Sequence, residues 1–441
     1  MLEASLFFII IFAFVLLTIL KLPRGISFFL ISMAVLLLSE KNLPIHILVN
    51  GAFGYFDAVM TVLCAVLFIT AIEKSGLLKH IATVLTTSLG SKPRLLIMLT
   101  TILSMSGGMI TGSSSSSILT TGAVAFPIFK AAGLDNKKAG TLVMISGVLG
   151  MIAPPLNIQA MVICEGVDMP YVGFTYPLLW LTVPAALIFA LLIAGRDLRS
   201  PAKTERVEFK LKDLLLYLPL IFAIVLSVLD SLSVIQIGLP LIFFASAVLA
   251  VFCSGKMRKF LEISLDAMDQ ALPILAILVG IGMLIEVMTL TGVRGFIVAN
   301  MLFFPYAVLF LSVGLGTPAF GAISSYGAAS VLGIPFLLAF RGGNDVLIAS
   351  SISLLAGLGD ILPPTALAST LAAQVSGLDS YMEVLKRSLG FLLTTMVLCV
   401  TFIAYSIRFA KIFANPWWFI LVVGMIFLVA TILDKTERKE K

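Results

Sequence analysis

The stretch that decides the fold runs from Ser104 to Pro155 and reads SMSGGMITGSSSSSILTTGAVAFPIFKAAGLDNKKAGTLVMISGVLGMIAPP. It is mostly hydrophobic, but residues 112–117 and 150–155 interrupt it where a membrane helix should be continuous. In hydrocarbon every backbone N–H and C=O needs a partner, so broken helices persist only where protein buries them or where they line a solvated cavity. This stretch is therefore a candidate binding site inside a membrane.

The same pattern returns in the second half of the chain. At an offset of 208, and without a gap, the residues Ser104, Gly108, Ser116, Ser117 and Pro127 align with Ser312, Gly316, Ser324, Ser325 and Pro335. At an offset of 209, Gly150-x-x-x-Pro154-Pro155 aligns with Gly359-x-x-x-Pro363-Pro364. Two matching sets of helix breaks are typical of a secondary transporter that is built from internal repeats.

Composition places the chain in a membrane. Of its 441 residues, 60% are hydrophobic and 12% are charged, and the mean hydropathy is +1.13. Such a chain lacks the polar residues that would cover a globule in water, so it is an all-α polytopic membrane protein. The net charge of +6 has a membrane explanation, given below, so we expect no nucleic-acid partner. The four cysteines lack the spacing of a metal site, and we expect no cofactor.

Eleven segments are apolar and long enough to cross a bilayer, taking about 20 residues as the norm. They lie near residues 5–20, 25–39, 56–72, 136–164, 176–194, 214–230, 235–253, 270–289, 345–376, 388–407 and 416–433. We interpret 136–164 and 345–376 as broken helices. Residues 94–130 and 305–340 are each long enough for two half-helices, and we predict two re-entrant hairpins there. Hydropathy alone also allows ordinary spans at both places.

The basic residues test this scheme. With the N-terminus outside, 24 of the 29 Lys and Arg residues fall on cytoplasmic segments and five fall outside, as the positive-inside rule requires. The C-terminus is then cytoplasmic. Residues 195–213 form a hydrophilic cytoplasmic linker between a first repeat, 1–194, and a second repeat, 214–407, and 416–433 is an extra helix. Each repeat has an odd number of crossings, so the second is inverted relative to the first.

Several polar groups could carry chemistry at the breaks. The serine run offers hydroxyls together with the free N–H and C=O groups of half-helix ends. Carbonyl and hydroxyl oxygens suit a hard cation such as sodium, and the N–H groups at a half-helix N-terminus suit a carboxylate. Each Pro-Pro pair frees backbone carbonyls, because proline lacks a donor and clashes with the preceding turn. The alternative is that the small residues merely allow close helix packing.

Asp360 is the most central carboxylate of the chain, and a buried membrane acid is a functional hypothesis by default, as a cation ligand or a proton carrier. A structural acid that hydrogen-bonds the broken backbone is the alternative. Gly357-Leu-Gly359-Asp360 also matches the GxGD sequence of intramembrane aspartyl proteases. That chemistry needs a second facing aspartate, and Tyr55-Phe-Asp57 has the wrong spacing to supply it. We therefore expect a transporter rather than an enzyme or a non-transporting scaffold.

The chain resembles the large membrane subunit of tripartite ATP-independent periplasmic (TRAP) transporters, within the broader ion-transporter superfamily. The resemblance rests on Gly112-Ser113-Ser114, Pro127, the run from Ser146 to Pro155, and Pro363-Pro364. It implies a sodium-coupled elevator in the bacterial inner membrane, a symporter that imports a small organic anion, usually a carboxylate. It further implies a small membrane subunit and a secreted substrate-binding protein as partners, and one sodium site between each hairpin tip and its own broken helix.

Two features depart from the family pattern, namely residues 314–327 and Asp360. Because of these departures, a proton-coupled carrier of the same superfamily, working without partner subunits, remains the alternative to a sodium-coupled TRAP subunit. No arginine or lysine lies at a predicted midplane, so we expect half-helix N-termini, hydroxyls, Asn157 and bound cations to hold the anion. The sequence leaves open which anion it is. The residues predicted to bind substrate are Ser113, Ser114, Ser115, Pro154, Pro155, Asn157, Pro364 and Thr365. The residues predicted to bind sodium are Gly112, Ser116, Ser117, Gly150, Gly316, Ser324, Ser325, Gly359 and Asp360.

Overall fold

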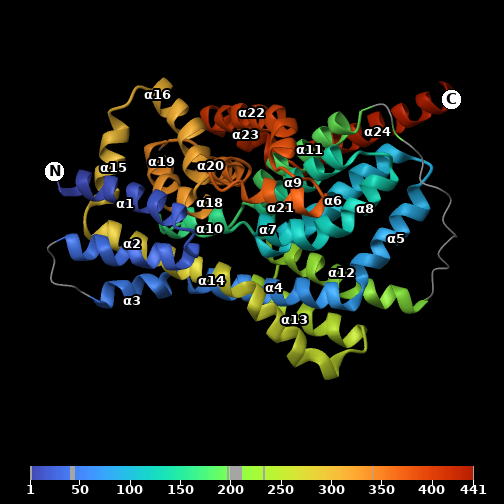
Figure 1. Ribbon diagram of the computed structural model, residues 1–441, viewed down its shortest axis with the longest axis horizontal. Coiled ribbons are helices and arrows are strands. Elements are labelled where there is room, and N and C mark those ends of the chain that lie inside the picture. Colours follow the sequence, from blue (N-terminus) through green and yellow to red (C-terminus); the bar gives the residue numbers. More distant parts are fainter. Residues whose placement is uncertain are drawn as a thin grey trace.

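The structure is a computed structural model that describes residues 2–39, 45–195, 198, 211–231, 234–340 and 342–440. The described residues form helices and no strand, so the prediction of an all-α multi-pass membrane protein is confirmed (Figure 1). Seven helices are long and apolar enough to cross a membrane. They are α1 (Leu2–Ile19), α4 (Phe56–Ser75), α6 (Pro93–Thr111), α11 (Thr175–Ala194), α14 (Phe260–Leu290), α22 (Met382–Ala404) and α24 (Pro416–Glu440).

The order of elements occurs twice along the chain. The second series begins with two helices, then a long one and a short one, and continues through a hairpin, a broken helix and a further helix. The first series has the same order, except that two successive helices, α3 (Ile45–Gly54) and α4, take the place of the long one. Besides α1, α4 and α11, the first series uses α2 (Arg24–Leu38), α3 and α5 (Leu77–Leu89). Besides α14 and α22, the second uses α12 (Leu211–Ser231), α13 (Leu239–Cys253) and α15 (Val293–Leu302). A short helix, α23 (Ser406–Phe413), precedes α24.

The hairpins and broken helices lie between these elements. The first hairpin consists of α6, α7 (Ser114–Ser117), the π-helix Ile118–Gly122 and α8 (Ala123–Ala131). The second consists of α16 (Tyr306–Leu311), the π-helix Ser312–Gly316, α17 (Thr317–Gly321), α18 (Ser325–Ala328), the π-helix Ala329–Gly333 and α19 (Ile334–Ala339). The first broken helix is α9 (Asn136–Ile152) with α10 (Ile158–Glu165). The second is α20 (Asp345–Leu358), the 3₁₀ turn Gly359–Ile361 and α21 (Leu367–Val375).

Some bounds differ from those expected. Helix α6 has 19 residues, or about 28 Å, so the first arm of the hairpin is a full-length helix rather than a half-helix. Helix α3 lies outside the predicted spans, because residues 45–54 are apolar but too short to cross a membrane alone. It meets α4 at Tyr55. Helix α14 has 31 residues and begins at Phe260, ahead of the predicted span. Most of the predicted linker, 196–197 and 199–210, lies outside the described residues.

The helices form two layers (Figure 1). Helix α14 packs along α2, α3 and α4, and α13 packs on α4, in the layer drawn at the bottom of the figure. The hairpins and broken helices form the layer above it, where α6 packs closely on α9. Glycines allow this closeness: a Cβ built on Gly108 would lie 2.6 Å from the carbonyl carbon of Gly150. The small residues of the deciding stretch therefore bring two helix backbones together.

Candidate functional site

The tips of the two hairpins meet inside the protein, although they lie about 200 residues apart in sequence. Helix α6 ends at Gly112, whose φ of 62° turns the chain into the serine run. The hydroxyl of Tyr326, at the start of the second arm of the other hairpin, donates a hydrogen bond of 3.0 Å to the Gly112 carbonyl. Tyr326 is buried. The contact fixes the two turns against each other, so polar groups of both tips share one buried region.

A serine caps the second arm of each hairpin. Ser113 accepts a hydrogen bond from the Ser116 backbone N–H at 3.3 Å, and Ser324 accepts one from the Gly327 N–H at 3.1 Å. Both are N-caps of the kind that serine favours. The structure thus pairs Ser113 with Ser324, an offset of 211, whereas the sequence alignment paired Ser116 with Ser324. This change of offset has a local cause. The second hairpin has a π-helix in its first arm and a longer turn at its tip, and both add residues before the second arm begins.

Asp360 is the polar centre of this region. It lies in the 3₁₀ turn that follows α20, and only 2% of its surface is exposed. The Ser114 hydroxyl donates a hydrogen bond of 2.6 Å to Asp360 Oδ2, so the first hairpin contacts the second broken helix. Ser325, which occupies the place of Ser114 in the second hairpin, lies beside the same carboxyl. Both tips therefore converge on one acid, where one ion site had been expected for each tip.

Two oxygen atoms of this cluster are buried without a hydrogen-bond partner among the described residues, namely Asp360 Oδ1 and Ser325 Oγ. Buried polar oxygens are nearly always satisfied in native proteins, and these two lie beside each other, so a small shift lets the Ser325 hydroxyl donate to Asp360 or lets both oxygens bind an ion. Nowhere in the described chain do three His, Cys, Asp or Glu side chains gather as a transition metal would require. A single carboxylate with hydroxyl oxygens suits a hard monovalent cation or a proton.

The remaining serines of the run are engaged differently. Ser117 is fully buried, and its hydroxyl donates to the Ser104 carbonyl at 2.8 Å. Thr121 donates to the same carbonyl at 2.7 Å, and Ser146 of α9 donates to the Ser104 hydroxyl at 2.6 Å. These bonds join the two arms of the first hairpin to the first broken helix. Ser115 and Ser116 are partly exposed.

Asn157 connects the first helix break. Its Oδ1 accepts from the Ala160 N–H at 2.9 Å and caps α10, while its Nδ2 donates to the Ile152 carbonyl at 3.1 Å. The same Nδ2 donates to the Ser353 hydroxyl of α20 at 2.9 Å, which ties the two broken helices together. The side chain is fully buried, and these bonds give the amide a structural role. Its predicted role in substrate binding stays a prediction.

Replacing Asn157 by alanine is expected to lower the free energy of unfolding by about 2–3 kcal/mol, because a cap and two further hydrogen bonds are lost. Thermal unfolding in detergent measures this change. Asn300→Ala is the matched control, since that exposed amide bonds only within its own helix. Unchanged stability of Asn157→Ala together with weakened substrate binding would instead favour the role predicted from sequence.

The second break is arranged without an asparagine. Thr365 donates to the Ala322 carbonyl in the second hairpin turn at 2.7 Å, and Ser369 donates to the Ile361 carbonyl at 2.8 Å. Pro363 and Pro364 are exposed, whereas Pro154 is buried and the Pro155 carbonyl accepts from the Tyr171 hydroxyl at 3.3 Å. The two breaks therefore differ in access: the second opens toward the surface of the chain and the first is enclosed.

Three predicted glycine ligands have other surroundings. The Gly150 carbonyl accepts from the Ala153 N–H at 3.2 Å, and the Gly359 carbonyl accepts from the Leu362 N–H at 2.9 Å. Both glycines allow close helix contacts, Gly150 with α6 and Gly359 with α17. Gly316 lies in the π-helix of the second hairpin, before its tip, and a Cβ there would meet nothing within 4 Å. Its predicted role as a sodium ligand stays a prediction.

Sequence reasoning missed Arg24. It was assigned to a cytoplasmic loop, yet the structure places it at the start of α2, where its charge acts on Asp360 and Tyr326. The expectation that no arginine or lysine lies at the membrane midplane stays a prediction, but a basic side chain does act on the Asp360 cluster. Arg24 was missed because only the packing of α1 and α2 against the second hairpin, marked by the edge-on contact of Phe14 and Phe320, brings it there.

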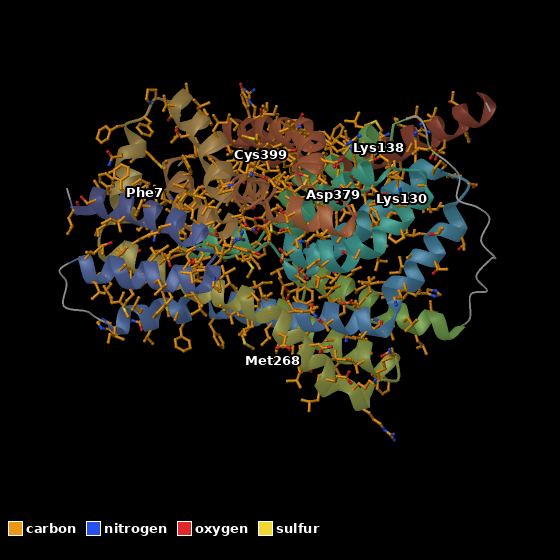
Figure 2. The ribbon with its side chains drawn as sticks, viewed as in Figure 1. Phe7, Lys130, Lys138, Met268, Asp379 and Cys399 are labelled. Carbon is orange, nitrogen blue, oxygen red and sulfur yellow. The ribbon has the colours of Figure 1, made fainter. Side chains whose placement is uncertain are left out.

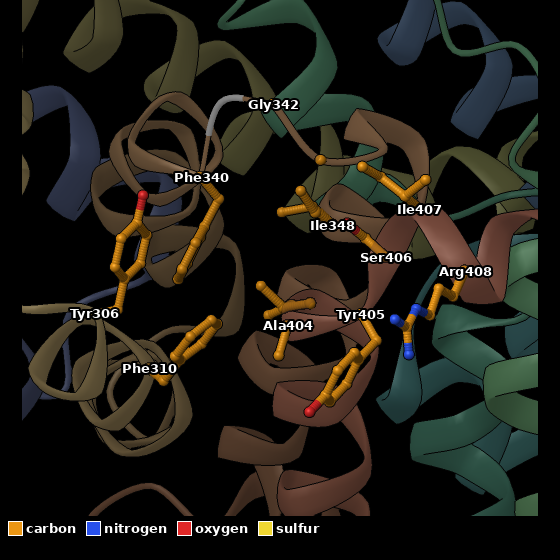
Figure 3. Close-up of a pocket in the computed structure, with 12 residues that line it drawn as sticks. Tyr306, Phe310, Phe340, Gly342, Ile348, Ala404, Tyr405, Ser406, Ile407 and Arg408 are labelled. Carbon is orange, nitrogen blue, oxygen red and sulfur yellow. The ribbon is translucent and has the colours of Figure 1, made fainter.

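A separate cavity lies elsewhere in the described chain. It has a volume of 290 Å³ and lies between the start of the second hairpin, the residues around Gly342 and the end of α22. Figure 3 shows the rings of Tyr306, Phe310 and Phe340 on one side of it and Tyr405 and Arg408 on the other. Its wall is mainly aromatic and aliphatic, and it has none of the predicted site residues. It is therefore separate from the Asp360 cluster.

Comparisons with known proteins agree with this picture. The family model described as "Tripartite ATP-independent periplasmic transporter, DctM component" matches residues 10–407. A search of curated proteins gave no significant match. Among solved structures, the chain is similar to the YdaH transporter of Alcanivorax borkumensis, with a TM-score of 0.55 and 15% sequence identity. The similarity covers 80% of this chain and 86% of the YdaH chain, and at this identity it establishes the fold alone.

Proposed function

The chain belongs to the DctM family, the large membrane component of tripartite ATP-independent periplasmic transporters, and on that premise we propose that it imports a small organic anion with sodium. The anion is a carboxylate in this proposal, and the inward sodium gradient drives its uptake. The family is one of transporters, so no enzymatic activity is assigned. The protein is a multi-pass membrane protein, and the bacterial inner membrane is the membrane that fits this family.

The observation that carries the proposal is the Asp360 cluster. A buried carboxylate that contacts both hairpin tips places a negative charge where a dehydrated sodium ion would need one. The unsatisfied oxygens of Asp360 and Ser325 are two ligands that such an ion could use. Because the cluster joins elements from both halves of the chain, a bound ion would hold the hairpins and the second broken helix in one arrangement.

We interpret the repeated order of elements as an inverted repeat and the two layers as the parts of an elevator. The layer of hairpins and broken helices would slide against the layer that contains α14. Among the described residues, Tyr55 of the α14 layer donates to the Val162 carbonyl of α10, which is one polar contact between the two layers. Lys130 and Lys138 lie toward the end of the molecule that holds the C-terminus, opposite Phe7 (Figure 2). This arrangement supports a cytoplasmic C-terminus and an outside N-terminus.

The partners in this proposal are a small membrane subunit and a secreted substrate-binding protein, as the name of the family implies. The binding protein would deliver the anion from outside. Helix α24 offers a lipid-facing surface on which a small subunit could pack, since only 6% of its apolar window is buried within the chain.

Uptake into proteoliposomes tests the coupling. A thermal-shift screen of the binding protein against carboxylates, sugar acids and sulfonates would first name the anion. Uptake of that anion is then expected to require an inward sodium gradient and to saturate. Sodium-independent uptake that a pH gradient drives equally well would reject sodium coupling. Failure of every tested anion to be taken up would reject the transporter proposal for this chain.

Proton coupling is the second candidate, because a buried carboxyl with one unsatisfied oxygen can also carry a proton. The pH-gradient arm of the same assay separates it from sodium coupling. The aspartyl-protease alternative has no such support. Asp57 is exposed and acts electrostatically on Glu165, so it is not the second acid that Asp360 would need.

A further inference from the structure

A second cavity is lined by residues of the second hairpin tip and the second helix break, which are elements that also contribute to the Asp360 cluster. It has a volume of 170 Å³ and is bounded by the end of α1, the loop into α2, the tip of the second hairpin and the second helix break. Its polar wall consists of Lys21, Arg24, Ser27, Ser324 and Thr365, and Phe14 and Leu22 are among its apolar residues. The cavity thus lies between the two layers of the fold.

The charge of this cavity is entirely positive. Lys21 and Arg24 both line it, and no acidic side chain does. Arg24 is partly buried, and within the described chain it forms no hydrogen bond or ion pair. A guanidinium presents several donors in a rigid fork that matches a carboxylate, so a partly buried arginine without a partner is a prepared anion ligand.

Neutral groups beside Arg24 complete the polar wall. Ser324 accepts a hydrogen bond from Gly327, and its own hydroxyl proton has no acceptor in the described part of the chain. Thr365 donates to the Ala322 carbonyl, which leaves its oxygen able to accept. The cavity volume equals that of about six water molecules. This space fits a short acid of a few carbon atoms.

We propose that this cavity binds the carboxylate group of a short organic acid and that Arg24 is its main ligand, with Lys21 and Ser324 in support. The inference rests on the proposed function and deepens it, because it names the substrate class and the residues that recognise it. One wall of the site belongs to the layer of α1 and α2, and the other belongs to the hairpin tip. A bound acid therefore bridges the two layers.

The position of Arg24 also links the acid to the coupling ion. Arg24 acts electrostatically on Asp360. The Asp360 carboxylate offsets part of the positive field of Arg24 as long as no cation is bound to it. A sodium ion at Asp360 removes that offset, so the acid binds more tightly in sodium. By linkage, the acid then strengthens sodium binding by the same factor.

Binding to the purified full chain in detergent tests the site without transport. The probes are glycolate, malonate and succinate, with succinamide as the uncharged counterpart of succinate, in sodium chloride or in choline chloride. Calorimetry and thermal shift measure binding. At least one acid is expected to bind the wild-type protein, and to bind it more tightly in sodium chloride than in choline chloride. Succinamide is not expected to bind. Arg24→Gln should weaken binding of that acid at least tenfold, and Arg24→Lys should weaken it less, because the charge remains while the fork is lost.

Arg408→Gln is the matched control, since it removes the same charge from the other cavity. It should bind the acid as wild type does, and ligand-free unfolding temperatures check that both variants fold. Equal binding by wild type and Arg24→Gln would overturn the proposal, as would loss of binding in Arg408→Gln alone or no binding of any probe to wild type. Arg24-dependent binding without sodium-driven uptake would instead sustain this site and reject the proposed coupling.

Discussion

Replacing Asp360 by asparagine is expected to raise the apparent sodium constant of uptake by at least tenfold, with the protein still folded. Asparagine keeps the shape of the side chain and can still accept the Ser114 hydroxyl, so the hairpin contact persists. It removes the only full negative charge of the cluster, and hydrogen bonds and contacts to charged groups contribute about 1.5–3 kcal/mol. Such an energy corresponds to roughly a tenfold to more than a hundredfold change in the binding constant.

Sodium titrations of uptake measure this effect. Asp345→Asn is the matched control, because it removes an exposed acid from the first turn of the same helix and should leave sodium dependence as in wild type. Ser114→Ala and Ser325→Ala should give intermediate shifts, since each removes one neutral oxygen. Wild-type sodium dependence in Asp360→Asn would mean that Asp360 is a structural acid and that the ion binds elsewhere.

Replacing Asp434 by alanine is expected to destabilise the fold by about 3 kcal/mol. Asp434 Oδ1 faces the guanidinium of Arg94 at 3.3 Å, and the side chains of Arg94 and Asp434 are 4% and 3% exposed. The same oxygen accepts from the Arg94 backbone N–H at 3.2 Å. Helix α24 is thereby fastened to the start of α6 and so to the first hairpin. Removing the acid leaves the Arg94 charge buried without the carboxylate that it faces.

Thermal unfolding in detergent compares Asp434→Ala with Asp379→Ala, in which an exposed acid is lost and little change is expected. The double variant Arg94→Met with Asp434→Leu should be more stable than Asp434→Ala, because a buried ion pair can be replaced by apolar side chains at little cost. A double variant less stable than the single one would show that Arg94 contributes through contacts other than this pair.

Local signals in the sequence anticipated the two helix breaks. Gly150 and Gly359, each followed by a Pro-Pro pair, mark the places where the two broken helices end, and the structure ends α9 and α20 there. The prominence of Asp360 also followed from sequence, because few other acids lie far from a span end. These features depend on residues close together in the chain, which a one-dimensional pattern records.

Other features depend on tertiary packing. The gapless alignment paired Ser116 with Ser324, since a π-helix and a longer turn leave no mark in sequence that distinguishes them from ordinary helix and loop. The contact of Ser114 with Asp360 joins the first hairpin to the second broken helix, whereas the resemblance suggested that each hairpin pairs with its own. Arg24 reaches the centre only through the docking of α1 and α2 against the second hairpin.

Radioactive sodium binding to the purified chain tests the central claim most directly, because it requires neither a substrate nor a partner. The central claim is that Asp360 holds a coupling sodium ion between the hairpin tips. Wild type and Asp345→Asn are expected to bind sodium saturably and equally, and Asp360→Asn is expected to bind at least tenfold more weakly. Equal saturable binding by all three proteins, or no saturable binding by wild type, would contradict the account.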